Sequence, residues 1–163
     1  METYHIRRAE KAITERAELL EIIREQKYVT LALCSGEQPY LVSVNYGYDV
    51  AENCFYFHCA KEGRKIDYLE ANPVVYGQIL EDNGYVAGEC DHAARTVQFR
   101  ARATFLESAE AKRRALALMI DQLEPDPEPV KARTLKAPRI AGVTVVSLQV
   151  ETLTGKRLGV AAS

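Results

Sequence analysis

The sequence has no long apolar run, no excess of charge of either sign and few cysteines. A membrane-spanning helix needs about 20 consecutive apolar residues, and no stretch approaches that length. The N-terminal stretch METYHIRRAEKAITERAELL is charged throughout and lacks the apolar centre of a secretory signal. A formal net charge of −2 gives no electrostatic reason to expect a nucleic acid or an anionic membrane as partner. We therefore expect a cytoplasmic protein with neither of these partners.

The four cysteines do not follow a recognisable metal or disulfide pattern. Cys54 and Cys59 lack the CxxC spacing of a tetrahedral zinc site, and Cys90 with His92 has no matching second pair. In a reducing cytoplasm all four thiols, including Cys34, would stay reduced. Spacing alone supports no Ser/His/Asp triad and no carboxylate pair. We therefore expect no bound metal and assign no catalytic residue.

The hydrophobic pattern divides the 163 residues, a length that suits one domain, into short strands and a few helices. Strands are predicted at Tyr28–Cys34, Tyr40–Tyr48, Cys54–Ala60, Val74–Leu80, Thr96–Leu106 and Val143–Leu153. Helices are predicted from Thr14 to about Gln26, within an N-terminal helical segment 1–26, and at Arg64–Ala71 and Ala109–Leu123. Residues 81–94 are expected to be mostly loop, and the proline-rich stretch 124–138 an extended connector.

The turns between the first three strands are too short for parallel crossovers. These strands are therefore expected to form an antiparallel meander. Five or six such strands with few helices favour a small barrel or sandwich. The predicted fold class is mainly β with flanking helices, in a single domain spanning 1–163. A dinucleotide site of the Rossmann kind is not expected on such a sheet.

The most informative segment runs from Phe55 to Ile66, where an aromatic strand enters a glycine-containing turn and then a helix. His58 and Ala60 share one face of this strand, opposite the face of Phe55 and Phe57. An isolated strand histidine is usually no more than a half-exposed side chain, but this one lies directly before a cationic turn. We interpret its face of the strand as a contact surface for the planar ring of a cofactor.

Three cations, Lys61, Arg64 and Lys65, crowd the start of the helix that follows. Such runs are often only solvated surface, yet cations at a helix N-terminus oppose the helix dipole at roughly 0.3–1 kcal/mol each where exposed. A phosphate among them would be favoured by the cations and by the free backbone N–H groups. Gly63 would let the backbone approach a phosphate oxygen closely. Because the turn lacks the spacing of a nucleoside triphosphate loop, the pattern predicts a phosphorylated planar cofactor.

Ser43 and Asn45 interrupt the apolar strand Tyr40–Tyr48 with polar side chains. A solvent-facing sheet edge explains them as well as a binding site does. As binding groups, the strand backbone and Asn45 would hydrogen-bond the polar edge of a flavin ring, which needs both donors and acceptors.

In these segments the sequence resembles the pyridoxamine 5′-phosphate oxidase-like family of split-barrel flavin proteins, and most closely its nitroimidazole-resistance (Nim-type) branch. The resemblance rests most specifically on residues 56–67, YFHCAKEGRKID, with support from residues 38–48, QPYLVSVNYGY. Weaker matches follow in the family's order at Asn72-Pro73, Cys90, Arg95-Thr96-Val97, Arg102-Ala103 and Thr154-Gly155-Lys156-Arg157. Together they cover nearly the whole chain.

The resemblance implies an antiparallel split β-barrel that forms a homodimer, with FMN bound at the subunit interface. The family's residue pair that meets the flavin and its ribityl phosphate falls on His58-Cys59. Its phosphate clamp falls on Arg64-Lys65, in agreement with the cation cluster that includes Lys61.

The resemblance also places the strand residues 43–45 against the isoalloxazine ring and a hydroxyl, that of Thr96, near the phosphate. The expected cofactor-binding set is Ser43, Val44, Asn45, His58, Cys59, Ala60, Lys61, Arg64, Lys65 and Thr96.

The implied function is an FMN-dependent oxidoreductase, and more finely a reductase of nitro compounds or other small electrophiles. Lys156 and Arg157 are the only C-terminal candidates for holding a substrate phosphate, so pyridoxamine-phosphate oxidase activity is not expected. Ala101 replaces the usual Nim-type glycine, and His92 replaces an aromatic, so the substrate pocket departs from that branch. The alternative is a non-catalytic flavin- or haem-binding module, a sensor, store or haem-utilisation protein, with His58, His92 or a cysteine on iron. A deazaflavin is a third cofactor option.

Overall fold

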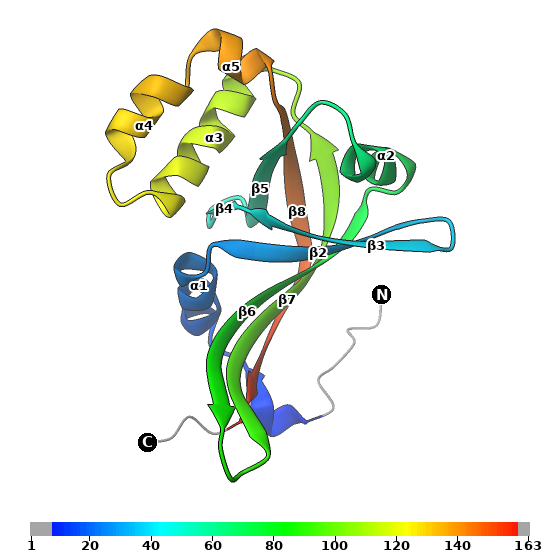
Figure 1. The fold of residues 1–163 in the computed structure, drawn as a ribbon, viewed down its shortest axis with the longest axis vertical. Helices are drawn as coiled ribbons and strands as arrows, with labels where there is room; N and C mark the ends of the chain where they lie inside the picture. The colour runs from blue at the N-terminus through cyan, green and yellow to red at the C-terminus, as the bar shows by residue number, and fades with distance from the viewer. Residues whose placement is uncertain (1–7, 160–163) are drawn as a thin grey trace.

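The computed structural model describes residues 8–159, so residues 1–7 of the predicted N-terminal segment lie outside the described residues (Figure 1). The strands are β1 (Ala12–Ile13), β2 (Tyr28–Ser35), β3 (Gln38–Asn45), β4 (Gly47–Asp49), β5 (Cys54–Cys59), β6 (Val74–Val86), β7 (Asp91–Phe105) and β8 (Thr144–Leu158). The helices are the 3₁₀ turn η1 (Ala9–Lys11), α1 (Arg16–Glu25), α2 (Arg64–Ala71), α3 (Ala109–Leu123), α4 (Pro127–Thr134) and α5 (Ala137–Ala141). The predicted fold class, mainly antiparallel β with flanking helices, is confirmed.

The two end strands of the sheet are joined by the covalent chain and not by hydrogen bonds to each other. Its strands follow the order β3-β2-β6-β7-β8-β5-β4, and β1 adds to β8. β3 and β4 stand at opposite ends of this path, although only Tyr46 separates them in sequence. This arrangement is consistent with a split barrel. It also corrects the predicted meander, because β3 pairs with β2 and only the short β4 pairs with β5.

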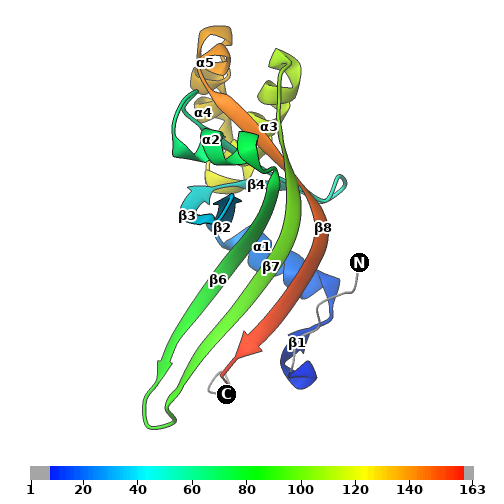
Figure 2. The ribbon, with the colours of Figure 1, turned by 90° about the vertical axis from the view of Figure 1, so that its right-hand side faces the viewer.

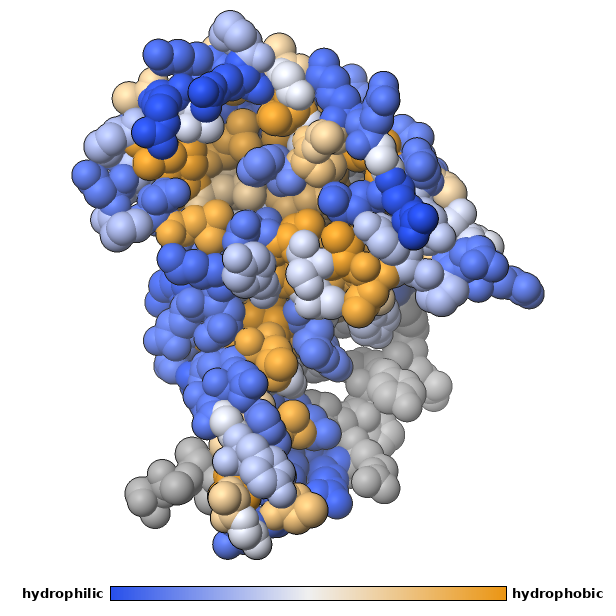
Figure 3. All heavy atoms as spheres, in the orientation of Figure 1, coloured by the Kyte–Doolittle hydropathy of each residue, from blue (hydrophilic) through white to orange (hydrophobic). Residues whose placement is uncertain are grey.

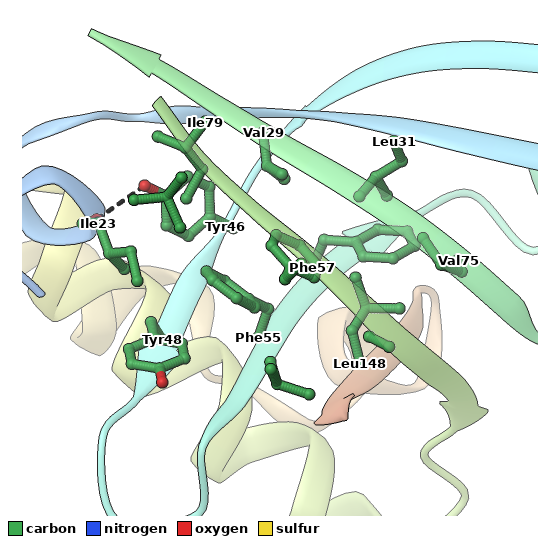
Figure 4. Close-up of a cluster of buried hydrophobic side chains, with 14 of the residues drawn as sticks. Ile23, Val29, Leu31, Tyr46, Tyr48, Phe55, Phe57, Val75, Ile79 and Leu148 are labelled. Carbon is green, nitrogen blue, oxygen red and sulfur yellow. Dashed lines mark hydrogen bonds between the residues drawn. The ribbon is translucent and has the colours of Figure 1, made fainter. Parts of the chain in front are cut away.

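Tyr46 marks the point at which the strand changes partners. Its side chain is fully buried, and its hydroxyl lies 2.7 Å from the carbonyl of Ile23 and 2.9 Å from that of Gln26. Both carbonyls belong to the end of α1, where backbone acceptors have no helical partner, and they share the single hydroxyl hydrogen. Figure 4 shows Tyr46 reaching from the core towards Ile23. The same side chain therefore fixes the bend of the strand and the position of α1.

The barrel core consists of alternate residues of the strands and one face of α1. Phe55 stacks on Phe99 with ring centroids 4.3 Å apart. The buried residues of α1 are Leu19, Ile22 and Ile23. The largest fully buried strand side chains are Val29, Leu31, Tyr46, Phe55, Phe57, Ile79, Phe99 and Leu148.

The stretch 124–138, predicted to be extended, is largely helical. Pro127 and Pro138 lie in the first turns of α4 and α5, where proline is tolerated because those N–H groups have no helical acceptor. Ile140 anchors α5 in a second apolar cluster that also contains Met119 of α3. Ser108 caps α3, with its Oγ accepting from the Ala111 amide at 3.1 Å. None of the helices within residues 8–159 is long and apolar enough to cross a bilayer.

The stretch 81–94, predicted to be mostly loop, forms a paired hairpin instead. β6 and β7 pair from Val74 opposite Arg102 to Val86 opposite Asp91, with one register shift on the way. Figures 1 and 2 show this hairpin projecting beyond the rest of the barrel. Its sequence is polar because the hairpin is exposed to solvent, and a polar sequence is typical of a loop. Its glycines occupy a bulge and a turn and do not end the strands.

We predict that Tyr46→Phe lowers the free energy of unfolding by about 1–3 kcal/mol, because both carbonyls lose the tyrosine hydroxyl and only that of Ile23 keeps a second donor, the Gln122 amide. The matched control is Tyr28→Phe, at a position 65% exposed, which should change stability by less than about 0.5 kcal/mol. Urea unfolding followed by circular dichroism measures both variants. Wild-type stability of the Tyr46 variant would contradict this role of the hydroxyl.

Candidate functional site

The barrel is split where β3 and β5 part. The pair Gly47 and Tyr56 is the last that the β4–β5 ladder forms on this side. Continuing the same register would place residues 43–45 opposite residues 58–60, but β3 turns to β2 and β5 turns to β8. The predicted site residues of the two strands therefore border one opening from its two sides.

Helix α2 lies beside this opening and packs against β2 (Figure 1). Leu69 inserts into the barrel core, and the Tyr68 ring lies 5.2 Å from that of Tyr40 on β3, measured between centroids. The Arg64 guanidinium carbon lies 5.6 Å from the centroid of the Tyr40 ring, in a cation–π contact. Sequence reasoning missed these two tyrosines, because a contact between a strand start and a later helix has no local signal.

The start of α2 offers donors and positive charge without acceptors of its own. Gly63, which precedes the helix, has a φ of +134°, a conformation that suits glycine. Among the described residues, the backbone N–H groups of Arg64 and Lys65 have no acceptor, as is usual in a first turn. Within that same part of the chain, Lys61, Arg64 and Lys65 form no ion pair. An anion bound here would meet unused donors and unpaired cations.

The end of β5 carries a neutral imidazole and a protonated thiol at pH 7. His58 lies at the surface, but its surroundings exclude enough water to lower its pKa from 6.5. Burial raises the pKa of the half-buried Cys59 thiol, and the Lys65 ammonium partly opposes that rise. The Lys65 ammonium therefore lies close enough to the end of β5 to influence Cys59. Ala60 follows, exposed, at the start of the loop.

The side chains on β3 are already partly engaged. The Ser43 hydroxyl lies 2.9 Å from the hydroxyl of Thr30, and the Asn45 amide nitrogen donates to the carbonyl of Lys27 at 3.0 Å. Val44 is half-buried and packs against the core. One of the two amide N–H groups of Asn45 is therefore used, and the second N–H and the carbonyl oxygen are left to meet a ligand.

The backbone of β3 presents an unpaired edge to the opening. The β2–β3 hairpin has a two-residue turn, 36–37, flanked by Ser35 and Gln38. In such hairpins the flanking residues form a hydrogen-bonded pair and every second pair follows suit. By this alternation Ser43 and Asn45 direct their backbone N–H and C=O groups away from β2. These groups are the donors and acceptors that a flavin edge requires.

Thr96 lies apart from the other predicted residues within one chain. It pairs with Leu80 and Lys156 in the sheet, is 8% exposed, and its hydroxyl lies 3.4 Å from the Lys156 carbonyl. Leu80 is six residues along β6 from Val74, the start of the strand that follows α2, and six residues span about 20 Å at the usual strand rise. The structure thus gathers nine of the ten predicted residues and separates the tenth.

The predicted residues line neither of two cavities found in the chain. The larger, about 810 Å³, lies at the base of the projecting hairpin beside α1 and the end of β8. The charged side chains that line it pair with one another, since Arg95 donates to Glu81 at 2.7 Å and Arg157 donates to Glu18. Hydrogen bonding to Arg95 lowers the pKa of the Glu81 carboxyl. The split, by contrast, is an open surface on a single chain.

The sequence model of the pyridoxamine 5′-phosphate oxidase family matches residues 15–157. The chain belongs to this family. The family predicted from residues 38–48 and 56–67 is thus confirmed. Among curated proteins, none matches the sequence closely enough to count as a relative.

Solved structures of similar fold include flavin- and haem-binding proteins. A candidate 5-nitroimidazole antibiotic resistance protein from Bacteroides thetaiotaomicron is 25% identical, with a TM-score of 0.78 over 91% of this chain and 87% of that one. A flavocytochrome from Azotobacter vinelandii is 18% identical, with a TM-score of 0.80 over 95% and 72%. The haem storage protein of Vibrio cholerae is 17% identical, with a TM-score of 0.64 over 87% and 94%. The last two likenesses show the fold alone.

We predict that His58 in the folded protein titrates below 6.5, because its surroundings disfavour the charged ring. The histidine is then neutral in both states above 6.5, and its contribution to stability is lost as the pH falls from 6.5 through the folded pKa. A proton NMR titration of the ring, assigned with His58→Gln, measures the midpoint. The urea-unfolded chain is the control, with a midpoint near 6.5. A folded midpoint above that of the unfolded chain would refute the assignment.

Proposed function

We propose that the protein is an FMN-binding oxidoreductase that reduces small molecules such as nitro compounds. The start of α2 carries this proposal, because three cations that form no ion pair within residues 8–159, and N–H groups without an acceptor there, meet at a positive-φ glycine beside the split. This donor set suits the ribityl phosphate of a flavin. The bound flavin supplies the electron transfer, and the protein supplies binding, orientation and electrostatics.

The two borders of the split would hold the flavin ring in different ways. The unpaired edge of β3 offers N–H and C=O groups of Ser43 and Asn45 to the polar edge of the ring. On the opposite border, His58 presents a neutral imidazole, with one nitrogen as donor and the other as acceptor. This suits contact with the ring or the positioning of a substrate. No residue of this set is assigned a proton-transfer role.

A second candidate function is a non-catalytic module that binds flavin or haem. Besides the flavocytochrome and the haem storage protein, a protein from Mycobacterium smegmatis described as FAD and haem binding shares the fold, with a TM-score of 0.78 at 15% identity. His58 at the strand end is exposed and its lowered pKa keeps the ring neutral, which is the form that binds iron. A bound flavin that no chemical or nicotinamide reductant reduces would favour this function. A deazaflavin would use the same phosphate seat.

We also propose that the protein is a homodimer and that the second subunit covers the split. The outer face of β3, β2 and β6 carries an apolar row in which Leu41, Ala32 and Tyr76 are neighbours through strand pairing. Leu41 is 67% exposed and Tyr76 51%, and Tyr28 and Leu80 extend the same face. Figure 3 shows apolar residues gathered across the middle of this side of the molecule. A contiguous apolar patch of this kind is typical of an interface.

Dimerisation would also explain two features of the single chain, the exposed split and the distance of Thr96 from α2. The split is an open surface, which a partner would close into a pocket. Thr96 lies beside Leu80 on the outer face, so a hydroxyl remote from α2 in its own chain would approach the seat of the other subunit. The role expected of Thr96 therefore stands or falls with the dimer.

We predict that Arg64→Ala with Lys65→Ala weakens FMN binding about 100-fold or more, as expected for the loss of two charge-assisted contacts to a phosphate. Lys11→Ala with Arg24→Ala is the matched control, because it removes two cations from η1 and α1 and leaves α2 intact. Fluorescence titration gives the FMN dissociation constants, and circular dichroism establishes that each variant is folded. Unchanged FMN affinity in the folded Arg64/Lys65 variant would rule out the α2 start as the phosphate seat.

We predict that Leu41→Asp with Tyr76→Asp produces a folded monomer, because charges placed on the apolar row cannot be buried at an interface. Sedimentation velocity measures the mass, and the FMN affinity should fall with it. The control is Val50→Asp, at an exposed apolar position in the β4–β5 turn, which should stay dimeric. A wild-type protein that sediments as a monomer with bound FMN would disprove the interface.

A further inference from the structure

A second group of cations lies at the end of the molecule where α3 begins and α5 sits. We call Lys112, Arg113, Lys136 and Arg139 the apical cluster. Among residues 8–159 none of the four forms an ion pair. Glu107 and Glu110 are the carboxylates on the neighbouring segment. Positive charge is therefore in excess here, in a chain whose total formal charge is −2.

The apical cluster is built on a packed scaffold rather than on a loose loop. The Lys112 ammonium donates to the carbonyl of Val143 at 3.1 Å, and the Arg113 guanidinium donates to the carbonyl of Leu135. These bonds join the first turns of α3 to the segments on either side of α5. α5 is itself held by Ile140, which is 2% exposed. Each cation has further N–H groups to offer, since lysine has three donors and arginine five.

The apical cluster continues directly from the proposed phosphate seat. Cys59 of β5 pairs with Thr144 of β8, the last pair before the strands end. From this pair the chain runs to Lys61 on one side and comes from Val143, the acceptor of Lys112, on the other. Figures 1 and 2 both show the β5–α2 loop beside α5. Lys61 therefore lies between the proposed seat at Arg64-Lys65 and the apical cluster, so the two groups of cations neighbour each other at this end of the molecule.

A single flavin phosphate does not account for both groups of cations. A flavin phosphate carries about two negative charges at most, and Lys61, Arg64 and Lys65 already balance them. The apical cluster is left with donors and charge for another anion that binds beside the flavin. We propose that it receives the phosphate groups of a nicotinamide dinucleotide, the electron donor of the flavin, and this rests on the function proposed above.

The position of the apical cluster favours a separate donor over a longer flavin cofactor. The two phosphates of FAD share one bridging oxygen, so its second phosphate would stay next to the first, at Lys61. A nicotinamide dinucleotide instead lays its ring against the flavin and brings its phosphates from outside the seat. An anion site on the far side of the β5–α2 loop suits that second geometry.

The test is calorimetric titration of NADP⁺, which does not react with oxidised flavin, into the FMN-loaded full-length chain. Lys136→Gln with Arg139→Gln should weaken NADP⁺ binding about tenfold, the size expected for two exposed charge contacts, and should flatten its salt dependence. The FMN dissociation constant of the same variant should stay within about twofold of wild type. Lys11→Gln with Arg24→Gln, the control for net charge, should leave both affinities unchanged.

Equal NADP⁺ affinity in the Lys136/Arg139 variant and wild type would overturn the proposal, even with FMN bound normally. A parallel titration of FMN-free protein with FAD separates the other source of phosphate. If the variant weakens FAD but not NADP⁺, the apical cluster serves a cofactor adenylate and the donor assignment is overturned. Loss of FMN binding in the Arg64/Lys65 variant alone, with NADP⁺ affinity retained, would keep the two sites distinct.

Discussion

The buried hydroxyl of Tyr46, shared between two carbonyls at the end of α1, is the contact on which the site depends. It holds the chain at the residue where one strand stops pairing with β2 and its continuation begins pairing with β5. A buried tyrosine without these acceptors would carry an unsatisfied hydroxyl, so bend and helix stabilise each other. The opening between β3 and β5 is the direct result, because the two strands cannot stay paired beyond the bend.

The opening suits a ligand with two different ends, because its two borders offer different kinds of binding groups. One border is a strand edge with backbone donors and acceptors, and the other is a strand end that leads into unpaired cations at a helix start. Cations at that end of a helix oppose the dipole and are a cost to the free protein. A phosphate bound there, as proposed, would remove the conflict and stabilise the folded protein. The same reasoning extends to the apical cluster, whose cations form no ion pair among residues 8–159.

Local signals in the sequence predict the elements that carry the proposed phosphate seat. The helix predicted at Arg64–Ala71 has these bounds in the structure, because the residue before Pro73 resists the helical conformation. The closure of the sheet could not be read in this way, since it depends on contacts between Tyr46 and a helix twenty residues earlier. The proline content of 124–138 predicts an extended connector because proline usually breaks a helix, but the structure places Pro127 and Pro138 in first turns, where proline is accepted. Family resemblance named Thr96, but only the structure shows its distance from α2.

The central claim is that the split holds FMN, and the most direct test is the visible absorption spectrum of the protein as purified. The bound molecule is then released by denaturation and identified by mass. The account predicts flavin bands and FMN at near one equivalent per chain. A Soret band with released haem would contradict it and direct attention to His58 as an iron ligand. A colourless protein that also fails to bind added FMN would contradict it outright.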